Sequence, residues 1–411
     1  MVSVRGMVIG VATVIGMACE MQSASAWTDD NPSAASQCVA ADVNDAGTVV
    51  ENCKVADASI AYVVLSGSAT QLSPLSSTPG GAPCHAQMIN NAQLGRETVA
   101  GWCQDANLVK QGVVWSSISP GSPLQLTPLG GLLGVGAGVR TEVTSVSAQG
   151  TVVGSSIDAN KNVTPVYWAA GFGVANALAV PLLAQQTNCV AIYINNAGTP
   201  SVVGSCPAAN GKTSAVLWTN VSSAYTTLPV PSGASYCVAQ QINLTGQILG
   251  NCLYGDDSRR VVLWGTGGTG PSVLATINGV TAQRSVGAYV NDSGLVAVNF
   301  LGQGAQAGFS EPAIWNPSSA NASEITLPSG AIHGEVLGVG DNGKMVGNFE
   351  TSGGTIHPFH VEPGSLTAVD DGSPEGGANA EVRAYSVGGT VEVGTAESGN
   401  ESEQSIVQSI P

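Results

Sequence analysis

The sequence predicts an all-β protein built from repeated four-stranded sheets, and three observations support this. Gly accounts for 53 of 411 residues and charged residues for only 10%, and no long stretch shows the 3.6-residue apolar period of an amphipathic helix. A motif of Asn, two small or polar residues and Gly recurs about every 48 residues, flanked by β-branched runs that are typical of strands. Cysteines flank four copies of this motif at matched distances.

Each repeat contains four strand-like pieces. In the fifth repeat they are CVAQQI, QILGNC, RVVLW and TGPSVLATI. Between the first two, the side chain of Asn243 is expected to cap a tight turn, and Gly246 is expected to adopt the positive φ that closes a four-residue hairpin loop. The repeats are marked by Asn44, Asn90, Ser147, Asn195, Asn243, Asn291 and Gly340, with a degenerate eighth copy near Gly388.

Four strands in about 48 residues is the period of a β-propeller blade. We therefore predict one β-propeller domain over residues 27–411, with eight blades favoured and seven blades plus a trailing hairpin as the alternative. The eighth repeat has only three strand-like pieces, and the segment AWTDDNPSAASQC has the length of the missing strand plus a linker. It is expected to complete the last blade. An open solenoid is less favoured because its ends would need polar caps.

The cysteine spacing predicts four disulfides, each within one hairpin. Opposing residues of an antiparallel pair have a constant index sum, and Cys237 and Cys252 share the sum of Asn243 and Gly246. Where a repeat has two or four extra residues in the turn, the cysteine spacing grows from 15 to 17 or 19. The register therefore pairs Cys38 with Cys53, Cys84 with Cys103, Cys189 with Cys206 and Cys237 with Cys252.

The third strand-like piece of most repeats ends in Trp, and a Trp at one fixed place per repeat is expected to pack between neighbouring sheets. Ligand stacking is the alternative function for these rings. The first repeat has Leu65 at this place and the seventh has His360. The residues concerned are Trp115, Trp168, Trp218, Trp264 and Trp315.

Residues 1–26 have the pattern of a secretory signal peptide. Arg5 precedes an apolar run of about 12 residues, and Ala24 and Ala26 occupy the small positions of a cleavage site. A lipoprotein anchor at Cys19 is disfavoured because Gly16 stands where a bulky aliphatic residue is expected. We therefore expect an exported chain, located in the periplasm, at the cell surface or outside a bacterium, without membrane insertion after signal cleavage. Its oligomeric state stays open.

Charge and motif content exclude several functions. The net charge is −16 with only 12 Lys and Arg residues, which argues against nucleic acid as a partner. No metal site and no cofactor are predicted, because the Asp spacing of a calcium loop, C-x-x-C pairs and phosphate-binding Gly loops are missing. His357 and His360 lie three residues apart in a predicted strand, so they point to opposite faces. The acidic stretch VDDGSPEGG is expected to be a solvated turn.

The stretch AVLWTNVSSAYTTLPVPSGASYCVAQQINLTGQILGNC resembles the HAF-repeat family of bacterial extracellular proteins, and IHPFHV resembles its His-x-Phe portion. The resemblance covers about residues 38–394. It implies a secreted, propeller-like protein, and the family carries no catalytic residues that can be transferred to this chain. The paired cysteines are additional to the usual repeat.

Three classes of function remain open, and the third is a purely structural envelope component with no small ligand. The favoured one is a secreted or periplasmic, non-catalytic propeller that acts in binding or adhesion, with a glycan, a peptide or an envelope protein as partner. The alternative is a carbohydrate-active hydrolase or lyase whose carboxylates come from different blades. A cluster of three or more Asp, Glu, His, Tyr or Arg side chains around one end of the channel would favour the enzyme. The Gly-rich insertion at residues 130–138 is the loop expected to contribute to binding.

Overall fold

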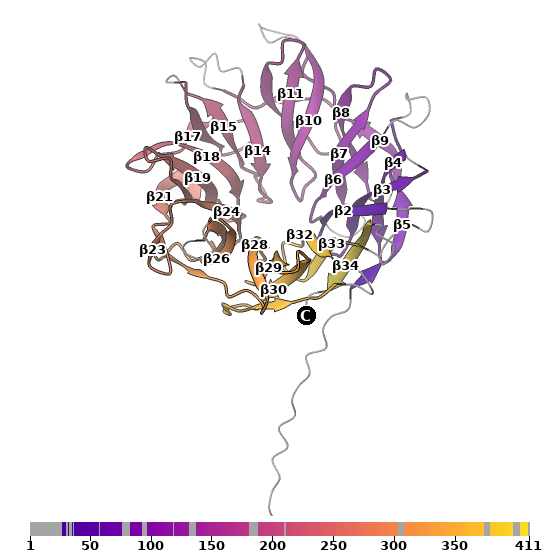
Figure 1. The fold of residues 1–411 in the computed structure, drawn as a ribbon. Coiled ribbons are helices and arrows are strands. Elements are labelled where there is room, and N and C mark those ends of the chain that lie inside the picture. Colours follow the sequence, from indigo (N-terminus) through magenta and orange to yellow (C-terminus); the bar gives the residue numbers. More distant parts are fainter. Residues whose placement is uncertain are drawn as a thin grey trace, which may run out of the picture.

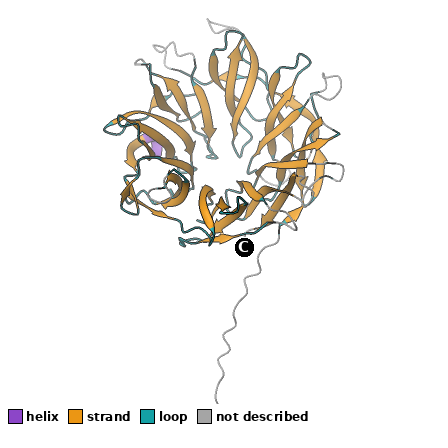
Figure 2. Ribbon diagram, in the orientation of Figure 1, coloured by secondary structure: helices purple, strands orange, loops and turns teal. Residues whose placement is uncertain are grey.

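The computed structural model shows a ring of eight sheets whose innermost strands face a common axis (Figure 1). Strands dominate, and the helix of the described residues is a single 3-10 turn, η1 (Thr266–Gly268) (Figure 2). The predicted eight-bladed propeller with four-stranded blades is confirmed. The structure describes residues 27–29, 32, 35, 37–56, 58–75, 83–92, 97–117, 119–130, 137–180, 188–208, 211–302, 308–373, 379–397 and 403–409.

Two expectations concern residues outside this set. The predicted signal peptide, residues 1–26, is one of them, and residues 131–136 of the Gly-rich insertion are the other.

Blades 1 to 4 follow one another along the chain, each running from the axis outward. Blade 1 consists of β2 (Gln37–Val43), β3 (Val49–Val55), β4 (Ala58–Leu65) and β5 (Ser68–Gln71). Blade 2 consists of β6 (Cys84–Ile89), β7 (Thr98–Gln104), β8 (Lys110–Ser116) and β9 (Ser119–Gln125). Blade 3 consists of β10 (Gly138–Val146), β11 (Val152–Asp158), β12 (Val163–Trp168) and β13 (Asn176–Ala177). Blade 4 consists of β14 (Val190–Ile194), β15 (Val202–Pro207), β16 (Thr213–Trp218) and β17 (Thr226–Thr227).

Blades 5 to 7 repeat the pattern, with one addition in blade 6. Blade 5 consists of β18 (Ala234–Ile242), β19 (Ile248–Tyr254), β20 (Arg259–Gly265) and β21 (Thr269–Val273). Blade 6 consists of β24 (Ser285–Val290), β25 (Val296–Leu301), β26 (Ser310–Trp315) and β27 (Asn321–Glu324), extended outward by the hairpin of β22 (Thr276–Ile277) and β23 (Val280–Thr281). Blade 7 consists of β28 (Ala331–Val339), β29 (Met345–Thr351), β30 (Ile356–Val361) and β31 (Ala368–Asp370).

The outer strand of blade 5 is shorter than the sequence predicted. The piece TGPSVLATI does not form a single outer strand of blade 5. It divides into β21 and β22, and β22 pairs in parallel with β27 of the next blade.

Blade 8 closes the ring with strands from both ends of the chain. It consists of β32 (Ala380–Tyr385), β33 (Val391–Glu397), β34 (Glu403–Ser409) and the N-terminal β1 (Thr28–Asp29). Thr28 pairs with Val407 and Asp29 with Ile406 in antiparallel register. The indole N–H of Trp27 also donates to the carbonyl of Asp371, which attaches the N-terminal segment to blade 7. The expected completion of the last blade by the N-terminus is thus present.

The repeated Asn has two functions in the structure. In blade 5, Oδ1 of Asn243 accepts a hydrogen bond from the Gln247 N–H at 2.8 Å, and Gly246 has a φ of 83°, as expected for the turn. The amide Nδ2 of Asn243 also donates to the carbonyl of Asn291, the equivalent residue of blade 6, at 2.8 Å. The same bond to the next blade is made by Asn44, Asn90, Asn195 and Asn291.

The inner strand of every blade carries a β-bulge just before this turn. In β18 the bulge lies between Ala239 and Gln241, and Oε1 of Gln241 accepts a hydrogen bond from the N–H of Val290 in blade 6 at 2.8 Å. A bulge re-aims the side chain that follows it. In blades 1, 3 and 5 this side chain, Asp42, Ser145 or Gln241, accepts a backbone hydrogen bond from the next blade.

The repeated Trp side chains lie in the core between blades, each at most 1% exposed. Trp264 donates its indole N–H to the carbonyl of Pro229 in the linker after blade 4, and Trp115, Trp168 and Trp218 make the equivalent contact with the blade before them. All five indole rings belong to apolar core clusters of the ring of blades. Strand register assigns the equivalent places in blades 1 and 7 to Val64 and Val361, one residue away from the expected Leu65 and His360.

Candidate functional site

A cavity of about 520 Å³ is lined by blade 6 and by the segment that leads into it, at the strand ends opposite the Asn291 turn. We call it the rim pocket. Its lining includes Ile277, Asn278, Val280, Thr281, Ala282, Arg284, Phe300, Glu311 and Glu324.

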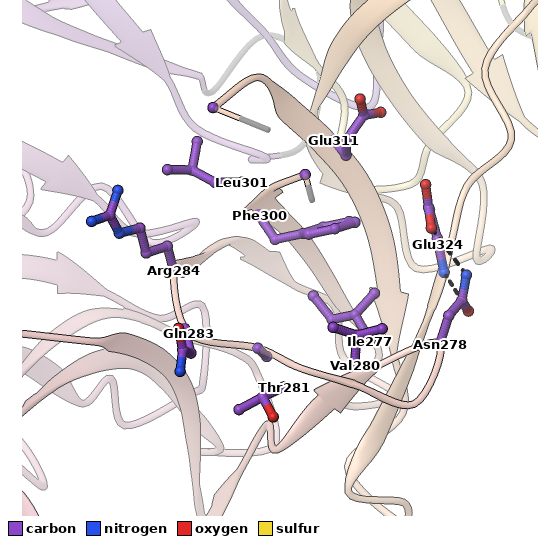
Figure 3. A pocket seen from close by; sticks show the side chains of 13 residues that line it. Ile277, Asn278, Val280, Thr281, Gln283, Arg284, Phe300, Leu301, Glu311 and Glu324 are labelled. Atoms are coloured by element: carbon purple, nitrogen blue, oxygen red, sulfur yellow. Dashed lines mark hydrogen bonds between the residues drawn. The ribbon is translucent and has the colours of Figure 1, made fainter. Parts of the chain in front are cut away.

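Strand register places the main side chains of the rim pocket on one face of blade 6. Phe300 lies directly opposite Glu311, and Glu324 lies opposite Ala313. Since residues 311 and 313 share a face of β26, Phe300, Glu311 and Glu324 share it too. This face packs on blade 5, because Ala313 and Phe300 belong to the apolar cluster that includes the core of that blade. Figure 3 shows Phe300 between Arg284 on one side and the two glutamates on the other.

Glu311 is the buried charged group of this pocket. It is 6% exposed, and its Oε1 has no hydrogen-bond partner among the described residues. Burial, and secondarily the neighbouring carboxylate of Glu324, raises the pKa of Glu311 to about 7. A buried carboxylate without a partner costs free energy, so the pocket lacks one hydrogen-bond donor or cation.

The outer wall of the rim pocket is the β22–β23 hairpin. Ile277 pairs with Val280, and the two residues between them, Asn278 and Gly279, have φ values of 47° and 80°. This is the geometry of a two-residue Asn-Gly hairpin turn. Asn278 Nδ2 donates to Oε2 of Glu324 at 3.0 Å, and the Glu324 N–H donates to Oδ1 of Asn278 at 3.3 Å. The hairpin therefore positions the Glu324 carboxylate.

Two arginines lie on the inner side of the pocket. Arg259 and Arg284 form an isolated parallel β-bridge, and both side chains are exposed. A second cavity of about 390 Å³, lined by both arginines, shares Arg284, Phe300 and Leu301 with the rim pocket. The two cavities therefore form one continuous surface, with Arg259, Arg284 and the acidic Asp257 in its second part and with Glu311 and Glu324 in the rim pocket.

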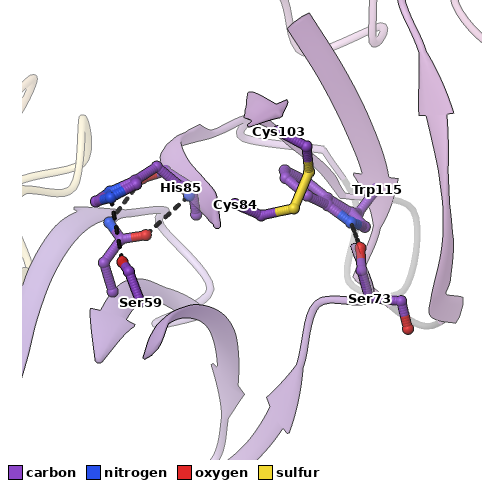
Figure 4. Close-up of a disulfide and its surroundings, with 8 residues drawn as sticks. Ser59, Ser73, Cys84, His85, Cys103 and Trp115 are labelled. Atoms are coloured by element: carbon purple, nitrogen blue, oxygen red, sulfur yellow. Dashed lines mark hydrogen bonds between the residues drawn. A yellow bond between two sulfur atoms is a disulfide. The ribbon is translucent and has the colours of Figure 1, made fainter. Parts of the chain in front are cut away.

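The rim pocket occurs where a disulfide is missing. Ser285 pairs with Phe300 in the register in which Cys237 pairs with Cys252 in blade 5. Figure 4 shows the equivalent disulfide of blade 2, between Cys84 and Cys103, beside Trp115. In blade 6 an aromatic ring thus takes the place of a compact cross-link. Blade 7 is similar, since Phe349 takes this place and lines a cavity of about 350 Å³.

All four disulfides join the cysteines that the hairpin register pairs. They link Cys38 to Cys53, Cys84 to Cys103, Cys189 to Cys206 and Cys237 to Cys252. Every one of these cysteines is at most 3% exposed. Four buried disulfides indicate an oxidising, extracytoplasmic environment. Among the described residues, no helix is both long enough and apolar enough to cross a bilayer.

A cluster of three or more ionisable side chains at one end of the channel was expected to favour an enzyme. The end at the Asn turns carries three carboxylates, those of Asp45, Asp292 and Asp341. Each of them, however, accepts a backbone hydrogen bond from a neighbouring blade. The N–H of Leu244 donates to Asp292, that of Asp292 to Asp341 and that of Gly388 to Asp45, over 2.7, 2.9 and 2.6 Å. These carboxylates join blades to one another, and the last of the three bonds connects blade 8 to blade 1.

Deeper in the channel, side chains from alternate blades meet. The rings of Tyr289 and Tyr385 are edge-on at 5.5 Å, and the phenol of Tyr385 occupies the space that a Cβ at Gly338 would need. Burial raises the pKa of Asp42 to about 7, although this carboxylate accepts hydrogen bonds from the N–H groups of Val43 and Ile89. The remaining cavity at this end measures about 210 Å³. Side chains from several blades therefore meet inside the channel.

The four histidines lie in separate surroundings. His85 stacks on Trp102 at 4.7 Å, and His333 Nε2 lies 3.0 Å from Glu350. His357 and His360 contact two different acids, Asp370 and Asp371 respectively. Within the described part of the chain, one group of potential metal ligands lies close together, Cys38, Glu51 and Cys53, and its two sulfurs are joined in a disulfide.

One acid of the stretch VDDGSPEGG is not in a solvated turn. The side chain of Asp371 is 4% exposed, and its Oδ1 lies 2.6 Å from Nδ1 of His360. The expectation was wrong because its partner, His360, comes from an adjacent strand that the linear pattern does not place beside it.

Sequence reasoning also missed the rim pocket, although two signals for it were present. Blade 6 lacks the cysteine pair, and INGV (Ile277 to Val280) contains an Asn-Gly pair between two apolar residues, a strong hairpin signal. These two signals together would have predicted an extra hairpin beside a blade without a disulfide.

No family model matches this chain, and no curated protein matches it. Among solved structures it is similar to a prolyl endopeptidase, with a TM-score of 0.55 and 11% identity over 91% of this chain and 54% of that one. It is also similar to the β-propeller domain of the trilobed protease from Pyrococcus furiosus, described as having an open velcro topology, with a TM-score of 0.50 and 8% identity over 79% and 93% of the two chains. At these identities the similarity establishes the β-propeller fold alone.

Proposed function

We propose that this protein is a non-catalytic β-propeller that acts in binding or adhesion outside the bacterial cytoplasm, and that the rim pocket is its binding site. The observation that carries the proposal is the buried Glu311 carboxyl, whose Oε1 has no hydrogen-bond partner among the described residues, at the edge of a cavity with an aromatic floor. An apolar pocket with a few convergent polar groups is typical of a ligand site.

Location outside the cytoplasm is supported by the four disulfides. Secretion to the periplasm, the cell surface or the medium, and membership of the HAF-repeat family, are parts of the same proposal. They agree with the signal-peptide pattern and the repeat pattern of the sequence.

One observation favours the alternative, a carbohydrate-active hydrolase. Glu311 and Glu324 are two carboxyl groups on neighbouring strands, and burial raises the pKa of Glu311 to about 7. Glycoside hydrolases use such a pair as acid and base or nucleophile. Binding is nevertheless the better account, because Asn278 holds the Glu324 carboxylate from the outer edge and both carboxylates lie on one wall of the pocket and not on opposite sides of it (Figure 3).

The experiment is a screen of the purified protein against glycan and peptide arrays, with a variant that blocks the rim pocket. Thr281 lines the pocket and is exposed, so Thr281→Trp fills the cavity without touching the core. The matched control is Thr227→Trp, at an exposed position of β17 in blade 4. We expect ligands that bind the wild type and the control and lose at least tenfold affinity for Thr281→Trp. Equal binding by all three proteins contradicts the proposal, and turnover of a bound glycan that Glu311→Gln abolishes shows the hydrolase instead.

A further inference from the structure

We propose that the rim pocket binds a peptide segment that places a lysine or arginine side chain against Glu311 and Glu324, with the aliphatic part of that side chain on Phe300. This inference rests on the proposed function and specifies the chemistry of its ligand.

Blade 7 has a different pair of residues at the same two positions. Strand register makes His357 the equivalent of Glu311, since His357 pairs with Phe349 as Glu311 pairs with Phe300. Asp370, paired with Phe359, is the equivalent of Glu324, paired with Ala313. In blade 7 the histidine Nδ1 lies 3.3 Å from the Asp370 carboxylate, and its ring lies 5.4 Å from that of Phe349.

In blade 6 both positions hold carboxyl groups, so the basic partner is missing from the blade itself. Among the described side chains, no Lys, Arg or His forms an ion pair with Glu311 or Glu324. The partner of Glu324 is the neutral amide of Asn278. In blade 7 the carboxylate of Asp370 lies beside the basic side chain of His357. A cation from outside the chain would give Glu311 and Glu324 a comparable basic partner.

The apolar floor indicates that this cation is attached to an aliphatic chain. Phe300, Ile277 and Ala282 line the pocket together with the carboxylates. Lys and Arg combine a hydrocarbon stem, which packs along apolar surface, with a charged end group that stays hydrated or paired. A neutral sugar supplies no charge to Glu311, and an amino sugar supplies no aliphatic stem.

The inner side of the surface favours a peptide for a second reason. The exposed guanidinium groups of Arg259 and Arg284 have no ion pair with any described residue. They lie beside the rim pocket in the continuous cavity, where they can donate to main-chain carbonyls or to an acidic side chain next to the bound lysine. The combined surface is thus complementary to a chain with a basic residue and an acceptor near it.

The test uses two probes, acetylated and amidated octapeptides that are identical except for a central lysine or a central norleucine. Norleucine keeps the aliphatic stem and removes the ammonium group. Binding to the purified protein is measured by isothermal titration calorimetry at pH 8, where Glu311 is ionised. We expect the lysine probe to bind the wild type at least tenfold more tightly than the norleucine probe. Equal affinities overturn the inference.

Three variants separate charge from packing. Glu324→Gln changes an exposed side chain, so folding is expected to be unchanged. It should weaken the binding of the lysine probe by three- to tenfold and leave the binding of the norleucine probe unchanged. Glu311→Gln should reduce the affinity for the lysine probe to the affinity for the norleucine probe. Glu311→Lys supplies the cation from within the chain and should abolish lysine binding with no loss of melting temperature. Unchanged lysine binding in the Glu311 variants overturns the inference.

The arrays distinguish this failure from failure of the proposed function. If glycans or uncharged peptides bind and Thr281→Trp blocks them, the pocket is a binding site and the inference about lysine or arginine is wrong. If no ligand is sensitive to Thr281→Trp, both are wrong.

Discussion

The side-chain amide of Asn243 donates a hydrogen bond to the main-chain carbonyl of Asn291, the equivalent residue in the next blade, over 2.8 Å. The same side chain accepts the hydrogen bonds that close its own turn. One residue type therefore specifies both the hairpin within a blade and the contact between blades, which explains why it recurs at the same place around the ring.

The two functions of Asn243 can be separated by substitution. Asn243→Ala removes the turn bonds and the inter-blade bond, and because these groups are buried we expect a loss of about 2–3 kcal/mol in the free energy of unfolding. Asn243→Ser should cost less, because Ser147 already occupies this place in blade 3, where its hydroxyl accepts the N–H of Thr151. Chemical denaturation measures both. Equal stability of the alanine variant and the wild type contradicts this account.

Each disulfide is local to one blade, so its removal should destabilise the protein without changing the topology. For Cys237→Ala with Cys252→Ala, which opens a loop of 15 residues, the chain-entropy model gives a loss of about 3 kcal/mol. Denaturation of the double variant measures the loss. Peptide mapping without reduction should show only links within a repeat, and a link between two blades would refute the register.

Trp27 contributes to closure of the ring through contacts with two blades. It packs on Val346 of blade 7 and on Val382 and Ile406 of blade 8. Trp27→Ala is expected to lower the free energy of unfolding by about 2 kcal/mol, below the usual range for a fully buried Trp, because this ring is only half-buried. Phe172→Ala, at a side chain that is 67% exposed, is the control and should leave the melting temperature unchanged.

Stability should fall as the pH rises toward neutrality. Asp42 and Glu311 have folded-state pKa values of about 7, raised from 3.8 and 4.5 chiefly by burial. Between those values the folded state binds more protons than the unfolded state, so the free energy of unfolding decreases with rising pH and levels off above about pH 7. Calorimetry should give a higher melting temperature at pH 5.5 than at pH 8. The variant with both Asp42→Asn and Glu311→Gln should show a smaller difference, and an unchanged difference contradicts the assignment.

The fold was predictable because its determinants are local and repeated. Asn243 and Gly246 define a turn, the turn fixes the register, and the register pairs Cys237 with Cys252. The rim pocket was not predictable in the same way. Glu311 is buried only because Phe300 and a hairpin from the preceding linker cover it, and its neighbour Glu324 is one strand away. Such contacts depend on which face of a blade meets which neighbour, and a single sequence does not specify that.

The most direct test of the central claim is the pKa of the Glu311 carboxyl, measured by carbon-13 NMR with and without the lysine octapeptide. The account predicts a value of about 7 in the free protein and a decrease when the lysine probe is added, because a cation beside a carboxyl group favours its ionised form. The norleucine probe should produce no decrease. A Glu311 signal that does not respond to the lysine probe would contradict the account.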